Sequence, residues 1–192
     1  REVLRMIDIV ESMLRTFLEA LQNDDRKLLA KLPPMDDALD RLHSAVKLHL
    51  TAVSRRDGLD STDSKRCSDI LAFTINLEHV GDIVEHIVDD LEEKKISKGR
   101  SFSAAGMKEV EELHARLMST LHLALNVFLN GDLKSAQTLI AQKAEFRDLE
   151  RAYAGTHFDR LAWQTPESVE TSSLHLDIIN EFKRINSHFC AI

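Results

Sequence analysis

The sequence contains few of the residues that make turns, cross-links and β-structure. Its 192 residues include 6 glycines, 3 prolines and 2 cysteines, and only 5% are aromatic. So few glycines and prolines cannot supply the many turns of a sandwich or barrel. The two cysteines, Cys67 and Cys190, exclude a disulfide scaffold and suit a reducing compartment. The 43% of hydrophobic residues argues against disorder, which leaves a soluble helical protein of one or two modules.

Long apolar runs are missing too. The longest, residues 118–129, contains four polar residues and is shorter than the roughly 20 residues that a membrane-spanning helix needs. Arg1, Glu2 and Arg5 occupy positions where the apolar core of a signal peptide would start. The helical pattern is already present at Arg1, which indicates an excised domain or an omitted leader. We therefore expect no direct membrane insertion by this segment.

Positive charge is scattered along the chain. The 25 lysines and arginines stand against 32 aspartates and glutamates, a net charge of −7. The basic pairs Arg55-Arg56 and Lys94-Lys95 are isolated and have acids nearby. Because contacts to a phosphate backbone need clustered Lys and Arg, we expect no nucleic-acid partner.

Apolar residues recur at spacings of three and four through almost the whole chain, which predicts an all-α fold of six helices with no strands. The second helix starts near Arg26 and is interrupted at Pro33-Pro34, since proline removes a backbone donor. The third starts with N-cap residues at 61–64. The predicted breaks between the helices are, in order, Asn23-Asp24-Asp25, Arg56-Asp57-Gly58, Gly99, Asn130-Gly131-Asp132 and Thr165-Pro166.

Three similarities between the two halves of the chain indicate an internal repeat. The turn that contains Asp25 reappears with Asp132, a shift of 107 residues, and His49 matches His157 at a shift of 108. Residues 77–82 match residues 182–187 at a shift of 105. A nearly constant shift is the signature of a duplicated unit. We therefore expect two tandem three-helix bundles, residues 1–99 and 100–192, in one compact domain.

The third predicted helix carries the concentrated acidic signal of the sequence. Glu78, Asp82, Glu85 and Asp89 lie on one flank of this helix, roughly opposite the apolar stripe 73–91. Like charges at this spacing repel by a few tenths of a kcal/mol per pair, and a bound cation would relieve that cost. Hard cations and carboxylate-bridged metals use such oxygen ligands. A solvated acidic face is the alternative interpretation.

A ferritin-like di-iron or di-manganese oxidoreductase is an alternative function. That fold uses Glu-x-x-His pairs on inward-facing helices, and Glu111-x-x-His114 fits, with Asp40-x-x-His43 as a weaker second pair. Glu111, however, projects away from the apolar stripe of its helix. We expect His49, His157 and His188 to be packing or capping residues; Gly-rich phosphate loops and nucleophile motifs are absent, so we expect no enzyme.

The string Leu77-Glu78-His79-Val80-Gly81-Asp82-Ile83 resembles the signature of the PhoU family of phosphate-uptake regulators, which lies on the third helix of a three-helix unit. Residues 157–161 and 182–188 look closer to the PhoU-like domain that follows the membrane part of bacterial sodium/phosphate cotransporters. The resemblance implies a cytoplasmic regulatory module, on the inner face of the membrane if it is fused to a transporter. Its expected partners are the membrane part of a transporter or another copy of the chain.

The resemblance also implies a metal site. Members of the family bind iron, zinc or similar clusters through Glu/Asp-x-x-x-Asp motifs, and Glu78 with Asp82 matches this motif. Asp36 and Asp40 would contribute if the second helix lies beside the third. The matching positions in the second half are Lys183 and Ser187, which cannot form the same site.

Overall fold

The computed structural model describes residues 1–55, 60–163 and 166–191, and every regular element in them is helical. The six predicted long helices are present, accompanied in the described residues by three short ones. The elements are α1 (Glu2–Asn23), α2 (Arg26–Leu29), α3 (Leu32–Ser54), α4 (Ser61–Leu91), the π-helical turn η1 (Glu92–Ile96), α5 (Ala104–Asn130), α6 (Leu133–Ala162), α7 (Pro166–Glu170) and α8 (Ser172–Phe189). The all-α prediction is confirmed.

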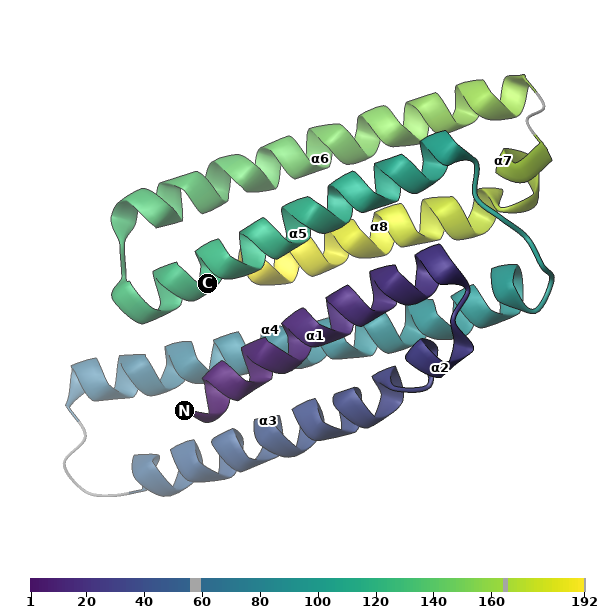
Figure 1. Ribbon diagram of the computed structural model, residues 1–192. Coiled ribbons are helices and arrows are strands. Elements are labelled where there is room, and N and C mark those ends of the chain that lie inside the picture. The colour runs from purple at the N-terminus through teal and green to yellow at the C-terminus, as the bar shows by residue number, and fades with distance from the viewer. Residues whose placement is uncertain (56–59, 164–165, 192) are drawn as a thin grey trace.

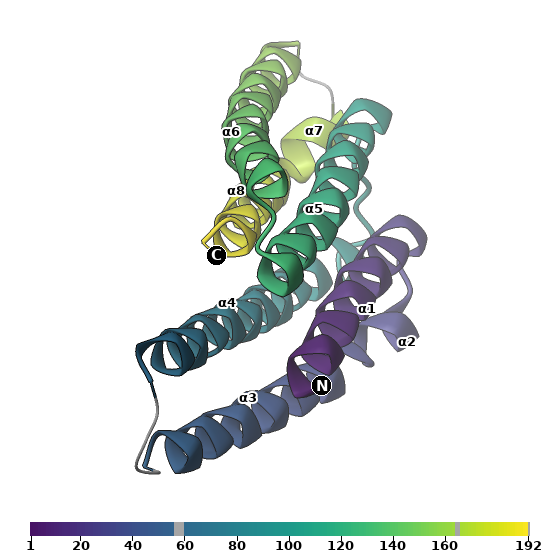
Figure 2. The same ribbon diagram turned by 90° about the vertical axis from the view of Figure 1, so that its left-hand side faces the viewer.

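The long helices form two three-helix units joined side by side. Helices α1, α3 and α4 pack against one another, and so do α5, α6 and α8. Between the units α1 contacts α5 and α4 contacts α8, while α3 and α6 lie on opposite outer sides (Figures 1 and 2). The apolar stripes of all six long helices meet in one continuous core, which includes Phe17, Phe73 and Phe182. The predicted pair of three-helix bundles is therefore present, with a shared core.

The two equivalent turns are built alike. Asp24 ends α1 with a φ of 52°, and Gly131 ends α5 with a φ of 62°, the left-handed conformation common after a helix. The next residue of each turn caps the following helix: Asp25 accepts hydrogen bonds from two backbone amides of α2, and Asp132 from two of α6. The repeat predicted from these residues thus has a shared conformation.

Two predicted boundaries were wrong in detail. Pro33 and Pro34 do not interrupt a helix but lie in the first turn of α3, where the missing proline donors have no intrahelical partner to lose. Asp60, not residues 61–64, caps α4 by accepting a hydrogen bond from the Asp63 amide. Gly99 has the predicted positive φ, 60°, after η1. The predicted breaks at Arg56-Asp57-Gly58 and at Thr165 lie outside the described residues.

None of the helices in the described part of the chain is both long enough and apolar enough to cross a membrane.

Candidate functional site

The acidic residues predicted on two different helices meet where α3 packs against α4. Asp36 and Asp40 of α3 and Asp82 of α4 each offer a carboxylate oxygen, and these oxygens lie within 4.8 Å of one another. Asp36 is buried, with 7% of its surface exposed, whereas Asp40 and Asp82 are exposed. Within the described ranges, no other group of three or more Asp, Glu, His or Cys residues has such geometry. We call these three residues the acidic cluster.

A glycine permits the close approach that forms the acidic cluster. A Cβ placed on Gly81 would lie 2.4 Å from Asp36 Oδ1 and 2.6 Å from Leu39 Cδ2, both closer than real contacts allow. The bare backbone of α4 therefore makes room for the Asp36 carboxylate. Gly81 belongs to the string that carried the family resemblance, so that string has a direct steric role in this site.

The environment of Asp36 is unfavourable for a carboxylate without a counter-ion. Its Oδ1 atom is buried and has no hydrogen-bond partner among the described residues. Burial, and then the negative charges of Asp40, Glu85 and Asp82, raise the pKa of Asp36 to about 7. A divalent cation would satisfy the buried oxygen and offset the mutual repulsion, so the residues fit a hard, oxygen-binding metal ion.

The predicted ligand Glu78 lies beside a different group of side chains. Its carboxylate is 4.0 Å from His43 Nδ1 and 3.6 Å from His79 Nε2, and it is not one of the three residues of the acidic cluster. The structure thus brings Asp82 together with Asp36 and Asp40, the residues expected as helpers, and places Glu78 one turn away on α4.

The residues of the ferritin-like alternative do not meet at one point. Glu111 accepts a hydrogen bond from Gln22 Nε2 at 2.6 Å. His114 is buried and contacts the carbonyl oxygen of Leu14 through Nε2 at 2.9 Å. The two side chains therefore have separate partners, and nothing in this geometry favours an oxidoreductase.

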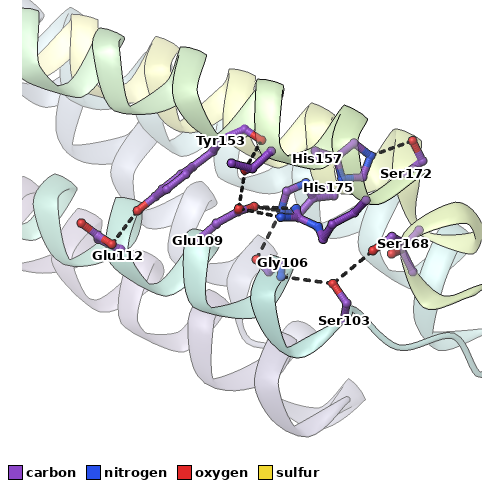
Figure 3. A network of polar contacts seen from close by, with 12 residues as sticks. Ser103, Gly106, Glu109, Glu112, Tyr153, His157, Ser168, Ser172 and His175 are labelled. Atoms are coloured by element: carbon purple, nitrogen blue, oxygen red, sulfur yellow. Dashed lines mark hydrogen bonds and ion pairs between the residues drawn. The ribbon is translucent and has the colours of Figure 1, made fainter. Parts of the chain in front are cut away.

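A second polar site, in the second unit, was missed by the sequence analysis (Figure 3). Glu109 of α5 is only 8% exposed and accepts two hydrogen bonds of 2.7 Å from Arg160 of α6 and a third from Thr156. His175 Nε2 of α8 lies 3.2 Å from both Glu109 Oε2 and the Gly106 carbonyl oxygen. Because both oxygens accept, this nitrogen carries the proton. We call this group the Glu109 network.

Ionisation in the Glu109 network follows from its contacts. Burial alone would raise the pKa of Glu109, but the hydrogen bonds from His175, Arg160 and Thr156 outweigh burial and lower the pKa to about 2. His157 stacks on His175 at 4.8 Å between ring centroids, and its Nε2 is 2.9 Å from Ser172 Oγ. Burial, with the nearby His175 and Arg160, lowers the pKa of His157 to about 4. The network therefore joins three helices through one ionised carboxylate.

The histidine predictions had mixed outcomes. His157 packs in the core as expected, and His188 Nδ1 contacts Asn76 Oδ1 at 2.9 Å. His49 is exposed, so of the predicted packing or capping role the packing part was wrong. The match of His49 to His157 was also wrong. Gly81 and Asn186 are equivalent at the shift of 105; Gly81 faces Leu39, and Asn186 lines a pocket with Phe146, so α3 and α6 correspond at a shift of 107. This shift pairs His157 with Leu50.

Comparison with known families and proteins gives a consistent result. The PhoU domain model matches residues 3–91 and again residues 110–192. The "Putative inorganic phosphate export protein YjbB" of Salmonella typhimurium is 38% identical over all 192 residues, and its counterpart in Escherichia coli K12 is 36% identical. In both cases the chain spans 35% of the length of the relative.

Solved structures support the same fold. PhoU from Pseudomonas aeruginosa matches with a TM-score of 0.86 at 17% identity, over 98% of this chain and 88% of the other. The phosphate transport system regulatory protein PhoU from Streptococcus pneumoniae matches with a TM-score of 0.80 at 17% identity, over 98% and 86%. Because the family model matches each three-helix unit in turn, this chain belongs to the PhoU family.

Proposed function

We propose that this chain is a non-enzymatic regulatory domain of phosphate transport that binds a divalent metal ion at the acidic cluster. The observation that carries the proposal is the similarity over the full chain to proteins named for inorganic phosphate export, combined with membership of the PhoU family. The domain would act by docking on the membrane part of a sodium/phosphate cotransporter, on the cytoplasmic side of the inner membrane. The membrane part belongs either to the same polypeptide or to a separate protein. Self-association of the domain is a second way in which it would dock.

The metal proposal is supported by the chemistry of Asp36. A buried carboxylate oxygen without a hydrogen-bond partner is costly unless a positive charge approaches it. Asp40 and Asp82 complete an all-oxygen set of donors, which suits Mn²⁺ or Fe²⁺ better than a site of sulfur or imidazole ligands would. Zinc is the third expected metal. The bound ion would hold α3 and α4 together at Gly81.

Calorimetric titration of the chelator-treated protein with Mn²⁺, Fe²⁺ and Zn²⁺ tests the metal site. We expect one ion per chain for wild type and at least a tenfold loss of affinity in Asp82→Asn. Asp89→Asn is the matched control, since Asp89 lies on the same helix but outside the acidic cluster. Glu78→Gln tests the ligand that the sequence motif predicted. If wild type binds none of the three ions, or if Asp82→Asn binds as wild type does, the metal proposal is wrong.

The regulatory role needs a separate test. The membrane part of a cotransporter from the same cell is reconstituted in vesicles, and the flux of radioactive phosphate is measured with and without this chain. We expect the two parts to co-purify and the flux to change at least twofold. Absence of both co-purification and an effect on flux would overturn the regulatory proposal.

A further inference from the structure

A basic pocket occupies the place in the second unit that the acidic cluster occupies in the first. It lies where α6 packs against α8 and has a volume of about 340 Å³. Three cationic side chains line it, together with Asn186, Ser187 and the apolar residues Ile140, Ala144 and Phe146. The three are Lys143, Arg147 and Lys183, and we call this site the basic pocket.

The residues of the two sites correspond position by position. At the shift of 107 that relates α3 to α6, Asp36 becomes Lys143 and Asp40 becomes Arg147. At the shift of 105 that relates α4 to α8, Asp82 becomes Ser187. The equivalent positions of the second unit therefore carry cationic or neutral groups where the first unit carries anionic ones.

The same replacement extends to the neighbouring ion pair. In the first unit Glu78 of α4 lies 4.0 Å from His43 of α3. At the equivalent positions Lys183 of α8 lies 3.3 Å from Glu150 of α6. The acidic residue lies on α4 in the first pair but on α6 in the second, so acid and base are exchanged between the two helices. We call the contact between α3 and α4, and that between α6 and α8, the seam of each unit. The inversion of charge therefore involves several residues of the seam and not one alone.

The cations of the basic pocket are available to a ligand. Lys143 has no carboxylate within 4 Å among the described residues, and Arg147 is only 3.9 Å from the exposed side chain of its neighbour Asp148. Lys183 alone has a closer partner, Glu150. In a chain of net charge −7, three cations around one pocket create a local positive field that attracts anions.

We propose that the basic pocket binds a phosphate group. Arginine offers a planar fork of donors that suits phosphate oxygens, and the two lysines add point charges. Inorganic phosphate and the phosphomonoester headgroup of a lipid share this chemistry. The site depends only on residues of the second unit and stands independently of metal binding in the first.

The test is calorimetric titration of the full chain with inorganic phosphate at constant ionic strength, set with NaCl. We expect saturable binding, with at least a tenfold loss in Lys143→Ala/Arg147→Ala. Lys108→Ala/Lys134→Ala is the control: it removes the same charge outside the basic pocket, and we expect a change of less than twofold. Lys183→Arg keeps the charge and should retain binding. Circular dichroism confirms that each variant is folded.

A second arm separates the two sources of phosphate. The chain is sedimented with vesicles of phosphatidylcholine alone and with vesicles that also contain phosphatidate. Binding to phosphatidate without binding of free phosphate assigns the pocket to a lipid headgroup and supports the shared chemistry. Asp82→Asn should leave either interaction intact, so failure of the metal site leaves this proposal standing. The proposal is overturned if neither inorganic phosphate nor phosphatidate binds, or if Lys143→Ala/Arg147→Ala binds them as wild type does. Capture of an acidic partner protein in place of these ligands would also overturn it.

Discussion

The two three-helix units share a scaffold but distribute charge in opposite ways. The seam of the first unit gathers Asp36, Asp40 and Asp82, whereas the seam of the second gathers Lys143, Arg147 and Lys183. Among the described residues, a buried carboxylate with several charged partners occurs in the second unit alone, in the Glu109 network. Since apolar positions maintain the shared core in both units, the polar positions were free to change. The two halves of one domain therefore present side chains of opposite charge at equivalent helix contacts.

The largest difference between the units should appear on removing Glu109. Glu109→Ala leaves Arg160 partly buried without its partner, so we expect the free energy of unfolding to fall by about 3 kcal/mol. The equivalent residue of the first unit, Glu2, makes an exposed ion pair with Arg5, and Glu2→Ala should change stability by less than about 0.5 kcal/mol. Urea unfolding at pH 7 measures both. Equal effects of the two variants would contradict the comparison.

The pH dependence of stability sharpens this contrast. The pKa of Glu109 is lowered to about 2. Its contribution to the free energy of unfolding is therefore present above pH 4.5 and is lost as the pH falls towards 2. The pKa of His157 is lowered to about 4, so folding is further opposed as the pH falls from 6.5 to 4. We expect Glu109→Gln to reduce the loss of stability below pH 4.5, as measured by thermal unfolding from pH 3 to 7, and to leave the part due to His157. An unchanged slope in that variant would show that other groups cause the loss.

A methyl group at Gly81 tests the steric basis of the acidic cluster. Gly81→Ala forces a Cβ against Asp36 and Leu39, so we expect a loss of about 2 kcal/mol. Gly155→Ala, on α6, has no heavy atom within 4 Å of the new Cβ and should gain about 0.5–1 kcal/mol from helix propensity. Urea unfolding at pH 7 measures both variants. A gain in both would mean that α3 and α4 do not approach as closely as the structure shows.

Neutralising Asp36 should raise the free energy of unfolding of the metal-free protein, whereas neutralising Glu109 should lower it. The pKa of Asp36 is raised to about 7, so its ionisation weakens the metal-free fold increasingly from about pH 4 to pH 7. In chelator-treated protein at pH 8, Asp36→Asn should therefore be more stable than wild type by about 1–2 kcal/mol. At pH 4 the two proteins should be equal within error. Chemical unfolding at both pH values checks this, and a destabilised variant at pH 8 would contradict it.

The smallest effect is expected at the inverted ion pair. Lys183 is 38% exposed, so its attraction to Glu150 is screened by water. We expect Lys183→Gln to change the free energy of unfolding by less than about 1 kcal/mol, while phosphate binding falls several-fold. Urea unfolding and calorimetry on the same samples separate these two results. A large loss of stability would assign Lys183 a structural role instead.

Much of the fold could be predicted because it depends on local signals. Apolar spacing gave the six long helices, and the aspartates at 25 and 132 marked the turns that their caps stabilise. The short helix α7 was missed, since 5 residues carry too little periodicity. The break predicted at Pro33-Pro34 lies instead between Leu29 and Leu32. The sequence could not distinguish the two, because proline is compatible with the first turn of a helix as well as with the interruption of one.

The sites were less predictable because they depend on contacts between helices. Asp36 and Asp40 were expected to join Asp82 only if α3 lay beside α4, and no spacing along the chain could establish that. The Glu109 network draws on α5, α6 and α8, and no short motif unites its members. The sequence already matched Glu78 and Asp82 with Lys183 and Ser187, but the counterparts of Asp36 and Asp40 became clear only when contacts between helices fixed the shift between α3 and α6. Lys143 and Arg147, which follow Asp36 and Asp40 at a shift of 107 residues, are the signal in the sequence that indicates the inversion.

The most direct test of the two opposite sites is anomalous diffraction from crystals grown with Mn²⁺ and arsenate, a phosphate analogue. Data collected at the manganese and arsenic absorption edges locate the two ions separately. We predict manganese at Asp36, Asp40 and Asp82, and arsenate at Lys143, Arg147 and Lys183. Both ions in the same unit, or neither ion at its predicted seam, would contradict the account.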